Sequence, residues 1–263
     1  MRKIARLFAM EWSRMLQYRV ETAMWIMAEA MSPLIALAVW YNVAQNSTGV
    51  LTPPEVLTYY VLAIFTQIVV NAWGGFFLSQ EILNGDIVKY LVRPFSPFWP
   101  HIVNNIVEKI IKLLIPLPVL IAVLYFLPSY FSPAIYAAKN ILPALFSLLL
   151  AAIIAFSLDI AFGALAFWVE DSIQIRRYSE VLYAIASGLL VPFAFMPASV
   201  QAVLNFLPYR YIIAAPIEIL MGATTGPDLT KTIIIQVAWI VILITALAQL
   251  WRRGLKHYAI PGQ

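Results

Sequence analysis

The sequence of 263 residues contains no cysteine, only two histidines and few charged residues. Without cysteine the chain can form no disulfide, no thiolate metal site and no thiol nucleophile. Charged residues make up 11% of the chain, hydrophobic residues make up 62%, and the mean hydropathy is +0.84. This leaves too little polar surface to solubilise a compact globule of this length. The composition therefore predicts a chain whose solvent is the lipid bilayer.

Motifs for nucleotide binding and catalysis are also missing. The sequence contains no Gly-Lys pair and therefore cannot form the phosphate loop G-x-x-x-x-G-K-[ST]. His101 and His257 are expected in loops, far apart and without ligand-spaced companions, and neither H-E-x-x-H nor G-x-S-x-G is present. We therefore expect no catalytic residue and no bound metal or cofactor in this chain. An enzyme embedded in the membrane is the least favoured class.

One pair of carboxylates, Glu170 and Asp171, is a further candidate for acid–base chemistry. The pair lies in a predicted cytoplasmic loop beside Arg176 and Arg177. A solvated ion-pair cluster is the simpler explanation for this spacing.

Long apolar runs are the main positive feature of the sequence. A helix that crosses the hydrocarbon core needs about 20 consecutive apolar residues. Runs of this kind predict an all-α, polytopic membrane protein in which residues 1–263 form a single transmembrane domain. The six predicted spans are Thr22 to Val43, Val56 to Leu78, Lys112 to Leu127, Ile141 to Trp168, Val181 to Phe195 and Thr232 to Trp251.

Lys and Arg are distributed unevenly around these spans. With both termini in the cytoplasm, fourteen of the 17 fall inside, and only Lys139, Arg210 and Lys231 fall outside. This is the asymmetry that orients multi-pass proteins in the cell (inner) membrane. It also accounts for the net charge of +4 without a nucleic-acid partner. The inside group is Arg2, Lys3, Arg6, Arg14, Arg19, Lys89, Arg93, Lys109, Lys112, Arg176, Arg177, Arg252, Arg253 and Lys256.

The first 20 residues are amphipathic rather than uniformly apolar. Their apolar side chains share one helical face, and the basic and polar residues lie elsewhere. We predict a helix that lies in the plane of the cytoplasmic interface. The apolar face contains Ile4, Leu7, Phe8, Trp12, Met15 and Leu16.

Residues 196–222 are apolar and long enough for a seventh span, but three prolines and an arginine interrupt them. An arginine at the centre of a span costs about 2.5–3.5 kcal/mol. A seventh span would also place the basic C-terminal end outside. We therefore predict two short re-entrant helices in the outer leaflet, broken at Leu207-Pro208-Tyr209. The interrupting residues are Pro197, Pro208, Arg210 and Pro216.

The longest polar stretch is the predicted cytoplasmic loop 79–104. Within it, residues 79–94 have the pattern of short amphipathic helices with a break at Gly85 and an end at Pro94. An apolar knob between charged flanks suits either a surface that docks into a partner's groove or a helix that lies passively at the membrane interface. The apolar set is Ile82, Leu83, Ile87 and Leu91, and the charged set is Glu81, Asp86, Lys89 and Arg93.

Two short motifs and the order of the predicted elements carry a family resemblance. Glu81-Ile82, Gly85 and Leu91-Val92-Arg93-Pro94 are similar to a coupling segment, and the closing Arg253-Gly254-Leu255-Lys256-His257-Tyr258 is similar to an R-x-G-L-x-x-Y tail. Over essentially the whole chain, the sequence resembles the membrane subunit of ABC-2-type exporters.

This resemblance implies a permease that works as a dimer with a second copy or a paralogue. Each subunit would dock onto a separate ABC ATPase subunit that uses ATP and Mg²⁺, and the N-terminal helix would brace the ATPase side. The outer helices with Pro197, Pro208, Arg210 and Pro216 would form the extracellular gate. The resemblance does not identify the substrate. The coupling residues that it implies are Glu81, Ile82, Gly85, Asp86, Leu91, Arg93 and Pro94.

Three polar residues inside the predicted spans are candidates for a translocation pathway, because such groups are costly in lipid and usually face protein or water. Glu29 lies about two turns into the first span, where snorkelling toward the headgroups is an alternative. Asp159 lies deeper and either lines a polar pathway or pairs within the bundle. Asn71 suits an interhelical hydrogen bond as well as a substrate contact. The glycines expected to allow close helix packing are Gly74, Gly75, Gly163 and Gly188.

An ion-gradient-driven secondary transporter is the main alternative, because six spans could form half of a pseudo-symmetric carrier. Such carriers contain matched broken helices in their two repeats, and the two halves of this chain share only loose similarity. A neighbouring reading frame that encodes an ATPase would favour the exporter.

Overall fold

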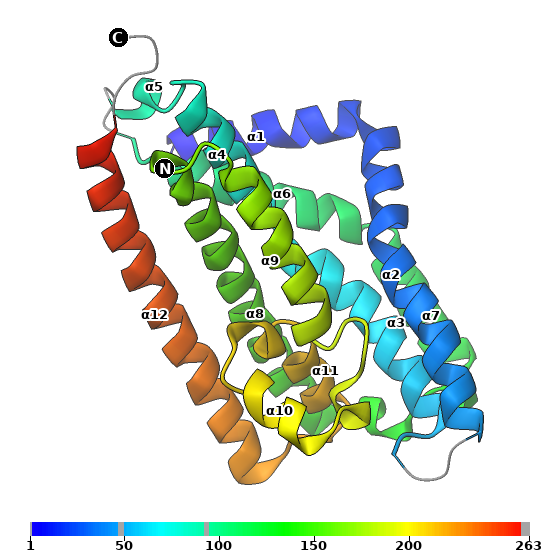
Figure 1. The fold of residues 1–263 in the computed structure, drawn as a ribbon. Coiled ribbons are helices and arrows are strands. Elements are labelled where there is room, and N and C mark those ends of the chain that lie inside the picture. The colour runs from blue at the N-terminus through cyan, green and yellow to red at the C-terminus, as the bar shows by residue number, and fades with distance from the viewer. Residues whose placement is uncertain (1, 47–49, 92–94, 259–263) are drawn as a thin grey trace.

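The computed structural model describes residues 2–46, 50–91 and 95–258, and every regular element in these residues is a helix (Figure 1). The prediction of an all-helical chain is therefore confirmed. The α-helices are α1 (Arg2–Gln17), α2 (Arg19–Asn46), α3 (Pro53–Val70), α4 (Gly74–Leu83), α5 (Val88–Leu91), α6 (Phe98–Leu113), α7 (Pro116–Phe126), α8 (Ala138–Ala164), α9 (Ser172–Ala186), α10 (Ala198–Leu204), α11 (Ala214–Leu220) and α12 (Gly226–His257). Short 3₁₀ helices cover Pro128–Tyr130, Pro133–Tyr136, Leu165–Phe167, Phe193–Phe195 and Pro208–Tyr211.

The described residues contain four to six candidate membrane spans, which agrees with a multi-pass membrane protein. Four spans meet the length and hydropathy criteria on their own, namely Arg19–Asn46, Pro53–Leu83, Ala138–Phe167 and Gly226–His257. Two helix pairs meet the length and hydropathy criteria only together, namely Phe98–Leu113 with Pro116–Phe126, bent by 40°, and Ala198–Leu204 with Pro208–Leu220, bent by 87°.

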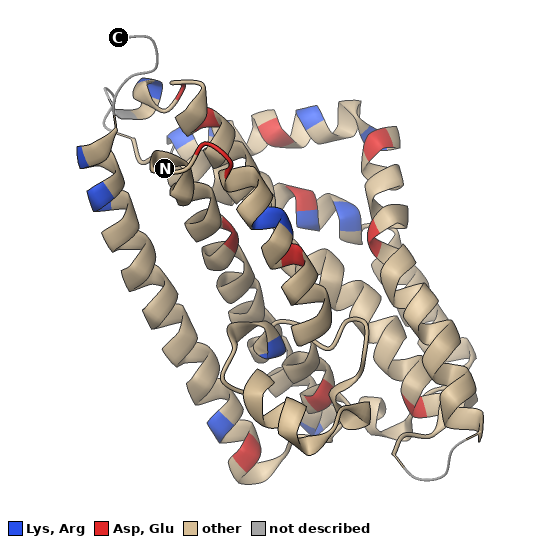
Figure 2. Cartoon of the chain, in the orientation of Figure 1, with Lys and Arg blue, Asp and Glu red and all other residues tan. Residues whose placement is uncertain are grey.

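The long helices run between two ends of the molecule. α1, α5 and the C-terminal end of α12 lie at one end, and α10 and α11 lie toward the other (Figure 1). α1 leads into the start of α2 but points in a different direction, so the two helices do not share an axis (Figure 1). Most of the Lys and Arg residues lie toward the end with α1 and α5, which we call the basic end (Figure 2). The uneven charge of the sequence is thus also uneven in space.

The second predicted span, Val56 to Leu78, is a broken helix. α3 ends at Val70 and α4 begins at Gly74, so residues 71–73 are not helical. α4 then continues to Leu83, five residues beyond the predicted end of the span. The first part of the predicted loop 79–104 is therefore the last part of this helix.

The third predicted span, Lys112 to Leu127, is only part of a longer bent pair. α6 already begins at Phe98, so the last part of the predicted loop 79–104 is helical as well. The bend follows the end of α6, where Pro116 opens α7. Proline cannot donate a backbone hydrogen bond and is tolerated in the first turn of a helix, which explains a new start at this position.

The fifth predicted span, Val181 to Phe195, is not a continuous helix. α9 ends at Ala186, and Gly188 adopts a positive φ of 88° that side chains rarely permit. The unwound carbonyl groups that follow are paired by side chains from two other helices. Tyr59 Oη donates to the Gly188 carbonyl at 2.8 Å, and Trp40 Nε1 donates to the Leu190 carbonyl at 2.8 Å. Irregular backbone is stable inside the bundle because protein groups replace the missing helical donors.

The segment 196–222 contains two short helices, α10 and α11, on either side of the 3₁₀ turn Pro208–Tyr211. The chain therefore breaks where the Leu207-Pro208-Tyr209 sequence predicts. α11 is buried, and it packs mainly against α8 and α3. The larger of two apolar cores is centred on this contact.

A second apolar core lies at the basic end, and we call it the basic-end cluster. It joins the end of α4, the residues before α5, the end of α8 and the 3₁₀ turn Leu165–Phe167. Its buried members are Leu78, Ile82, Ile87, Ile160, Ala164, Ala166 and Phe167.

Candidate functional site

The break in the second span is a polar junction inside the bundle. Asn71, Ala72 and Trp73 separate α3 from α4, and the carbonyl groups at this break lack helical donors. Lys109 Nζ of α6 donates to the Asn71 carbonyl at 2.5 Å, and Arg176 Nη2 of α9 donates to the Ala72 carbonyl at 3.0 Å. Because buried carbonyl groups must be paired, cations from two other helices stabilise the break.

Asp159 of α8 lies at the N-terminal end of α4. Its Oδ2 accepts a hydrogen bond from the Gly75 amide at 2.6 Å, and its Oδ1 accepts one from Arg176 Nε at 2.6 Å. The Asp159 and Arg176 side chains are each only 9% exposed. A carboxylate is favourable at a helix N-terminus, and a buried charge needs a partner. Of the two roles that the sequence leaves open for Asp159, the structure shows pairing within the bundle.

Two glycines allow this close contact between α4 and α8. A Cβ on Gly75 would overlap the Asp159 carbonyl, and a Cβ on Gly163 would overlap the Gly75 carbonyl. The Ser79 hydroxyl donates to the Gly75 carbonyl at 3.0 Å in the same contact. The prediction of close helix packing is confirmed at these two glycines.

Glu29 belongs to the other half of the same junction. Its Oε1 accepts hydrogen bonds from Asn71 Nδ2 at 2.7 Å and from Lys112 Nζ at 2.6 Å. Lys112 also pairs with Glu108 at 2.7 Å. The Glu29 side chain is 7% exposed, so it pairs inside the bundle and does not snorkel. Together with Asp159, the three predicted pathway residues therefore converge on one break in one helix.

A cleft of about 790 Å³ opens beside the junction, between α1, α2, α4, α6 and α9. Aromatic rings line it, and the rings of Trp25 and Trp73 lie 5.5 Å apart. Charged groups of both signs also line it, among them Arg14, Glu21 and Arg177. A smaller cavity of about 90 Å³ lies against Asn71, Asp159, Arg176 and Tyr183. The cleft has the volume and the mixed lining of sites for organic molecules.

The predicted coupling residues occupy the end of α4 and the turn that leads to α5. Gly85 adopts a positive φ of 82°, which turns the chain after α4. Ile82 and Ile87 are 1% and 0% exposed, because they belong to the basic-end cluster. The expected apolar knob is therefore packed against the chain itself. The exposed side chains of this turn are polar, namely Asn84, Asp86 and Lys89. Leu91 ends α5, and Arg93 and Pro94 lie outside the described residues.

Glu81 holds this turn to α6. Its carboxylate accepts a hydrogen bond from Tyr90 Oη at 3.1 Å, lies 3.2 Å from His101 Nε2 and lies 3.6 Å from Lys89 Nζ. The expectation that His101 and His257 lie in loops is wrong, since His101 is 5% exposed within α6 and His257 is the last residue of α12. Among the described residues, no group of three or more His, Cys, Asp and Glu side chains could hold a metal ion.

Comparison with known families decides between an ABC transporter permease and an ion-gradient-driven secondary transporter. The family described as ABC-2 family transporter protein matches residues 27–262 of the chain. The chain belongs to this family. It is an ABC-2-type permease, an integral membrane protein of the kind that associates with an ABC ATPase subunit and typically has no ATPase site of its own. No curated protein matches the chain.

One of the residues predicted for the outer gate of the permease, Arg210, forms an ion pair with α11. Arg210 Nη2 donates to Glu218 Oε2 of α11 at 2.9 Å, and its guanidinium lies 4.4 Å from the centre of the Phe193 ring. This pair neutralises the arginine that argued against a seventh span. Pro197 precedes α10, Pro208 opens the 3₁₀ turn, and Pro216 lies in the first turn of α11.

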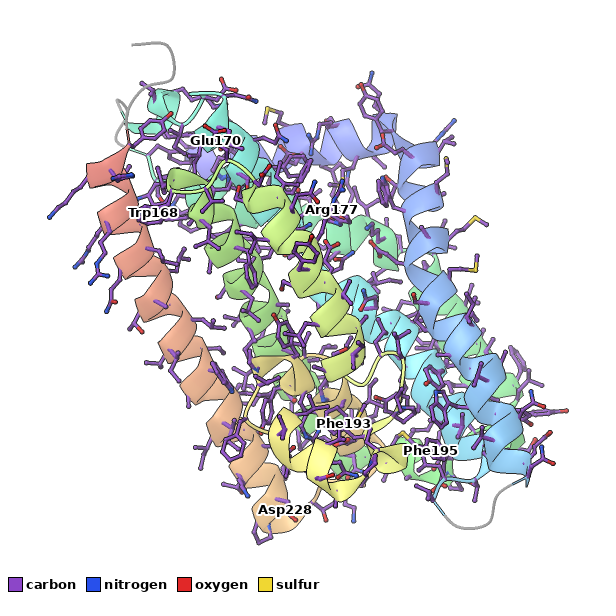
Figure 3. The ribbon with its side chains drawn as sticks, viewed as in Figure 1. Trp168, Glu170, Arg177, Phe193, Phe195 and Asp228 are labelled. Carbon is purple, nitrogen blue, oxygen red and sulfur yellow. The ribbon has the colours of Figure 1, made fainter. Side chains whose placement is uncertain are left out.

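The solvated cluster expected around Glu170 and Asp171 is absent from the described residues. Arg176 is buried and pairs with Asp159 and Glu180. Glu170 and Asp171 are exposed, and Figure 3 shows Glu170 in the loop before α9. α9 begins at Ser172, which turns Arg176 into the bundle instead of leaving it in a loop.

Sequence reasoning missed the cations that complete the permease's polar junction. Lys109, Lys112 and Arg176 were assigned only to the basic inner side, yet they pair with the acidic and amide groups of the spans. The signal was available, because a buried acid in a span predicts a buried base on a neighbouring helix. The helix that supplies that base depends on packing, which the sequence does not show.

Proposed function

We propose that this ABC-2 permease is the membrane-spanning subunit of an ATP-driven exporter. Two subunits, identical or paralogous, form the translocation pathway, and each is coupled to a separate ATPase subunit that binds ATP and Mg²⁺. The segment 79–94 is the contact with that ATPase. The basic end faces the cytoplasm of the cell (inner) membrane, with both termini on that side.

The proposal rests mainly on the position and the packing of the turn between α4 and α5. The turn projects at the basic end beside α1, and its exposed side chains are Asn84, Asp86 and Lys89. The apolar residues of the turn pack against α4, α6 and α8, so a displacement of the turn would be transmitted to three helices. A coupling element must combine an exposed contact surface with a stiff attachment, and this turn has both.

The cleft supports the transport of an organic molecule rather than of a bare ion. Its volume of about 790 Å³ is many times the volume of one water molecule, which is about 30 Å³ in the liquid. Aromatic walls and charges of both signs favour a molecule with apolar and polar parts. In the proposed dimer this cleft is the inner vestibule, and Arg210 with α10 and α11 forms the outer gate.

Orientation can be tested cleanly because the natural chain has no cysteine. Single cysteines in place of Asn84 and Asp228 lie at opposite ends of the molecule, and Figure 3 shows Asp228 at the start of α12. A membrane-impermeant maleimide added to intact cells should label Asp228→Cys and leave Asn84→Cys unlabelled until the membrane is permeabilised. Labelling of Asn84→Cys in intact cells would overturn the proposed orientation.

The ATPase partner can be tested with the complex itself. The permease is expressed with the ABC ATPase encoded beside it, the two are purified together, and ATP hydrolysis is measured in proteoliposomes. We expect co-purification and a permease-dependent change in the hydrolysis rate. If no ATPase binds and a membrane potential or proton gradient alone drives transport in the same vesicles, the secondary transporter is the correct function.

A further inference from the structure

The end of α12 and the residue that follows it, Tyr258, contact the end of α4. Tyr258 Oη donates to the Ile82 carbonyl at 3.1 Å, at the end of α4, where the same carbonyl also accepts a hydrogen bond from the Gly85 amide at 3.2 Å. Burial and the nearby Asp86 carboxylate raise the pKa of Tyr258, so the phenol stays protonated and can donate. The Tyr258 ring also lies 5.6 Å from the ring of Phe167.

Aromatic packing makes this contact specific. The Trp251 ring lies 4.7 Å from Phe98 of α6 and 5.3 Å from Phe167. Gly254 faces the same ring, and a Cβ at this position would overlap Phe167. The last two turns of α12, with Tyr258 after them, therefore contact α4, α6 and the 3₁₀ turn after α8. We call Trp251, Gly254 and Tyr258 the clasp.

The same helix is bound to the outer helices through Gln236, which lies about three turns after the start of α12 at Gly226. Gln236 is 0% exposed, and its Nε2 donates to the Tyr211 carbonyl at 3.0 Å and to the Ser147 carbonyl at 3.1 Å. Tyr211 ends the 3₁₀ turn that joins α10 to α11. Between these two attachments α12 also packs along α8, with Leu243 buried in the larger core, and its outer face is exposed and apolar, which suits lipid.

We infer that α12 is a connecting rod that links the coupling turn to the outer helices, with Tyr258 and Gln236 as its positioning residues. The inference rests on the proposed function for its role in transport, but the attachments are visible without it. A rigid helix of 32 residues spans about 48 Å at 1.5 Å per residue, which is enough to join both faces of a membrane. Displacement of the coupling turn would then shift Gln236 and the Tyr211 carbonyl in concert.

The clasp itself is tested without the ATPase. In a permease with a single cysteine in place of Ile87, which is 0% exposed in the basic-end cluster, labelling requires local opening of the turn. Tyr258→Phe in this background removes one hydroxyl and keeps the ring. Because one hydrogen bond contributes a factor of about 2–10 to a local equilibrium, we expect maleimide labelling in detergent to accelerate by about that factor. The matched control is Tyr178→Phe, at a ring that is 76% exposed on α9. An unchanged rate in Tyr258→Phe would overturn the clasp.

The rod is tested in the complete complex with its ATPase in proteoliposomes. A single cysteine replaces Val203, which is 64% exposed on α10, and its labelling is compared without nucleotide and after trapping with ATP, Mg²⁺ and vanadate. We expect a nucleotide-dependent change in the wild-type background that is lost in Tyr258→Phe and in Gln236→Met. Thr245→Val should keep it, because the Thr245 hydroxyl bonds only to its own helix.

A double variant separates the rod from two independent local effects. If both positions act through α12, Tyr258→Phe with Gln236→Met should reduce permease-dependent ATP hydrolysis no more than the stronger single change. Multiplied effects, or a nucleotide response at position 203 that survives both single changes, would overturn the rod. Failure of the ATPase to bind the wild-type permease would instead contradict the proposed function and leave the clasp result standing.

Discussion

The two ends of α4 are held by opposite means. At its start, Asp159 and Arg176 form a buried ion pair that also binds the backbone of the helix break. At its end, Ile82 and Phe167 pack in an apolar cluster. The polar contacts there are the partly exposed Glu81 carboxylate beside His101 and the hydrogen bond from Tyr258. A buried ion pair has one good geometry, and losing one partner leaves an unpaired charge. Apolar and aromatic contacts tolerate small shifts. The start of α4 is therefore suited to be a fixed point and its end to be a moving one.

The largest expected effect comes from breaking the fixed point. Asp159→Leu leaves the buried Arg176 with only the half-exposed Glu180 as a partner and leaves the Gly75 amide unpaired, and we expect a loss of about 3–5 kcal/mol in the free energy of unfolding. Thermal denaturation of the purified permease in detergent measures it. The double variant Asp159→Leu with Arg176→Met removes both charges and should recover most of the loss. A double variant as unstable as the single one would contradict the ion-pair explanation.

The glycine contact at the same point should be the next most sensitive. Gly75→Ala places a methyl group on the Asp159 carbonyl, and overpacking of this kind costs about 1–3 kcal/mol. Gly163→Ala places a methyl group on the Gly75 carbonyl from the side of α8. Because the two positions touch, their effects on the midpoint of thermal denaturation should not add. Independent, additive shifts would show that α4 and α8 are not in close contact here.

A substitution in the apolar cluster should cost less. Phe167→Leu keeps most of the apolar volume but loses the ring contacts with Trp251 and Tyr258, so we expect a loss of about 1 kcal/mol. Limited proteolysis should cut the turn between α4 and α5 faster in this variant. A stability loss as large as that of Asp159→Leu would remove the contrast between the two ends of α4.

The smallest effect on stability is expected at the exposed tip of the turn. Asp86→Lys changes a solvated side chain and should alter the free energy of unfolding by less than about 0.5 kcal/mol. The same change should weaken binding of the ATPase, because charge complementarity controls association. Surface plasmon resonance with the purified subunits measures this. Wild-type affinity in Asp86→Lys would show that the tip is not a contact.

The sequence was sufficient for the class of the protein and for the general order of its helices. Apolar runs mark the helices around Glu29 and Asp159, and prolines mark the break before Tyr209. The early end of α9 at Ala186 was not readable, since it depends on tyrosine and tryptophan donors from other helices. Local pattern cannot reveal which distant groups pair an unwound backbone.

The candidate site was readable in part. Glu29, Asn71 and Asp159 stand out as polar residues in apolar runs, and the structure joins them at one break. The turn proposed for coupling was singled out by its pattern and by the family resemblance, yet Ile82 and Ile87 have the same pattern whether they face a partner or the chain's own core. Only the packing of Phe167 and α12 distinguishes the two cases.

The proposed function requires that the turn between α4 and α5 touches the ATPase subunit. A benzophenone maleimide attached to a single cysteine at position 86, in a chain that is otherwise free of cysteine, tests this contact by photo-crosslinking in the purified complex. A permease–ATPase adduct from position 86, and none from position 228 at the opposite end, is the predicted result. No adduct from position 86 in an intact complex, or equal yields from both positions, would show that the turn does not touch the ATPase.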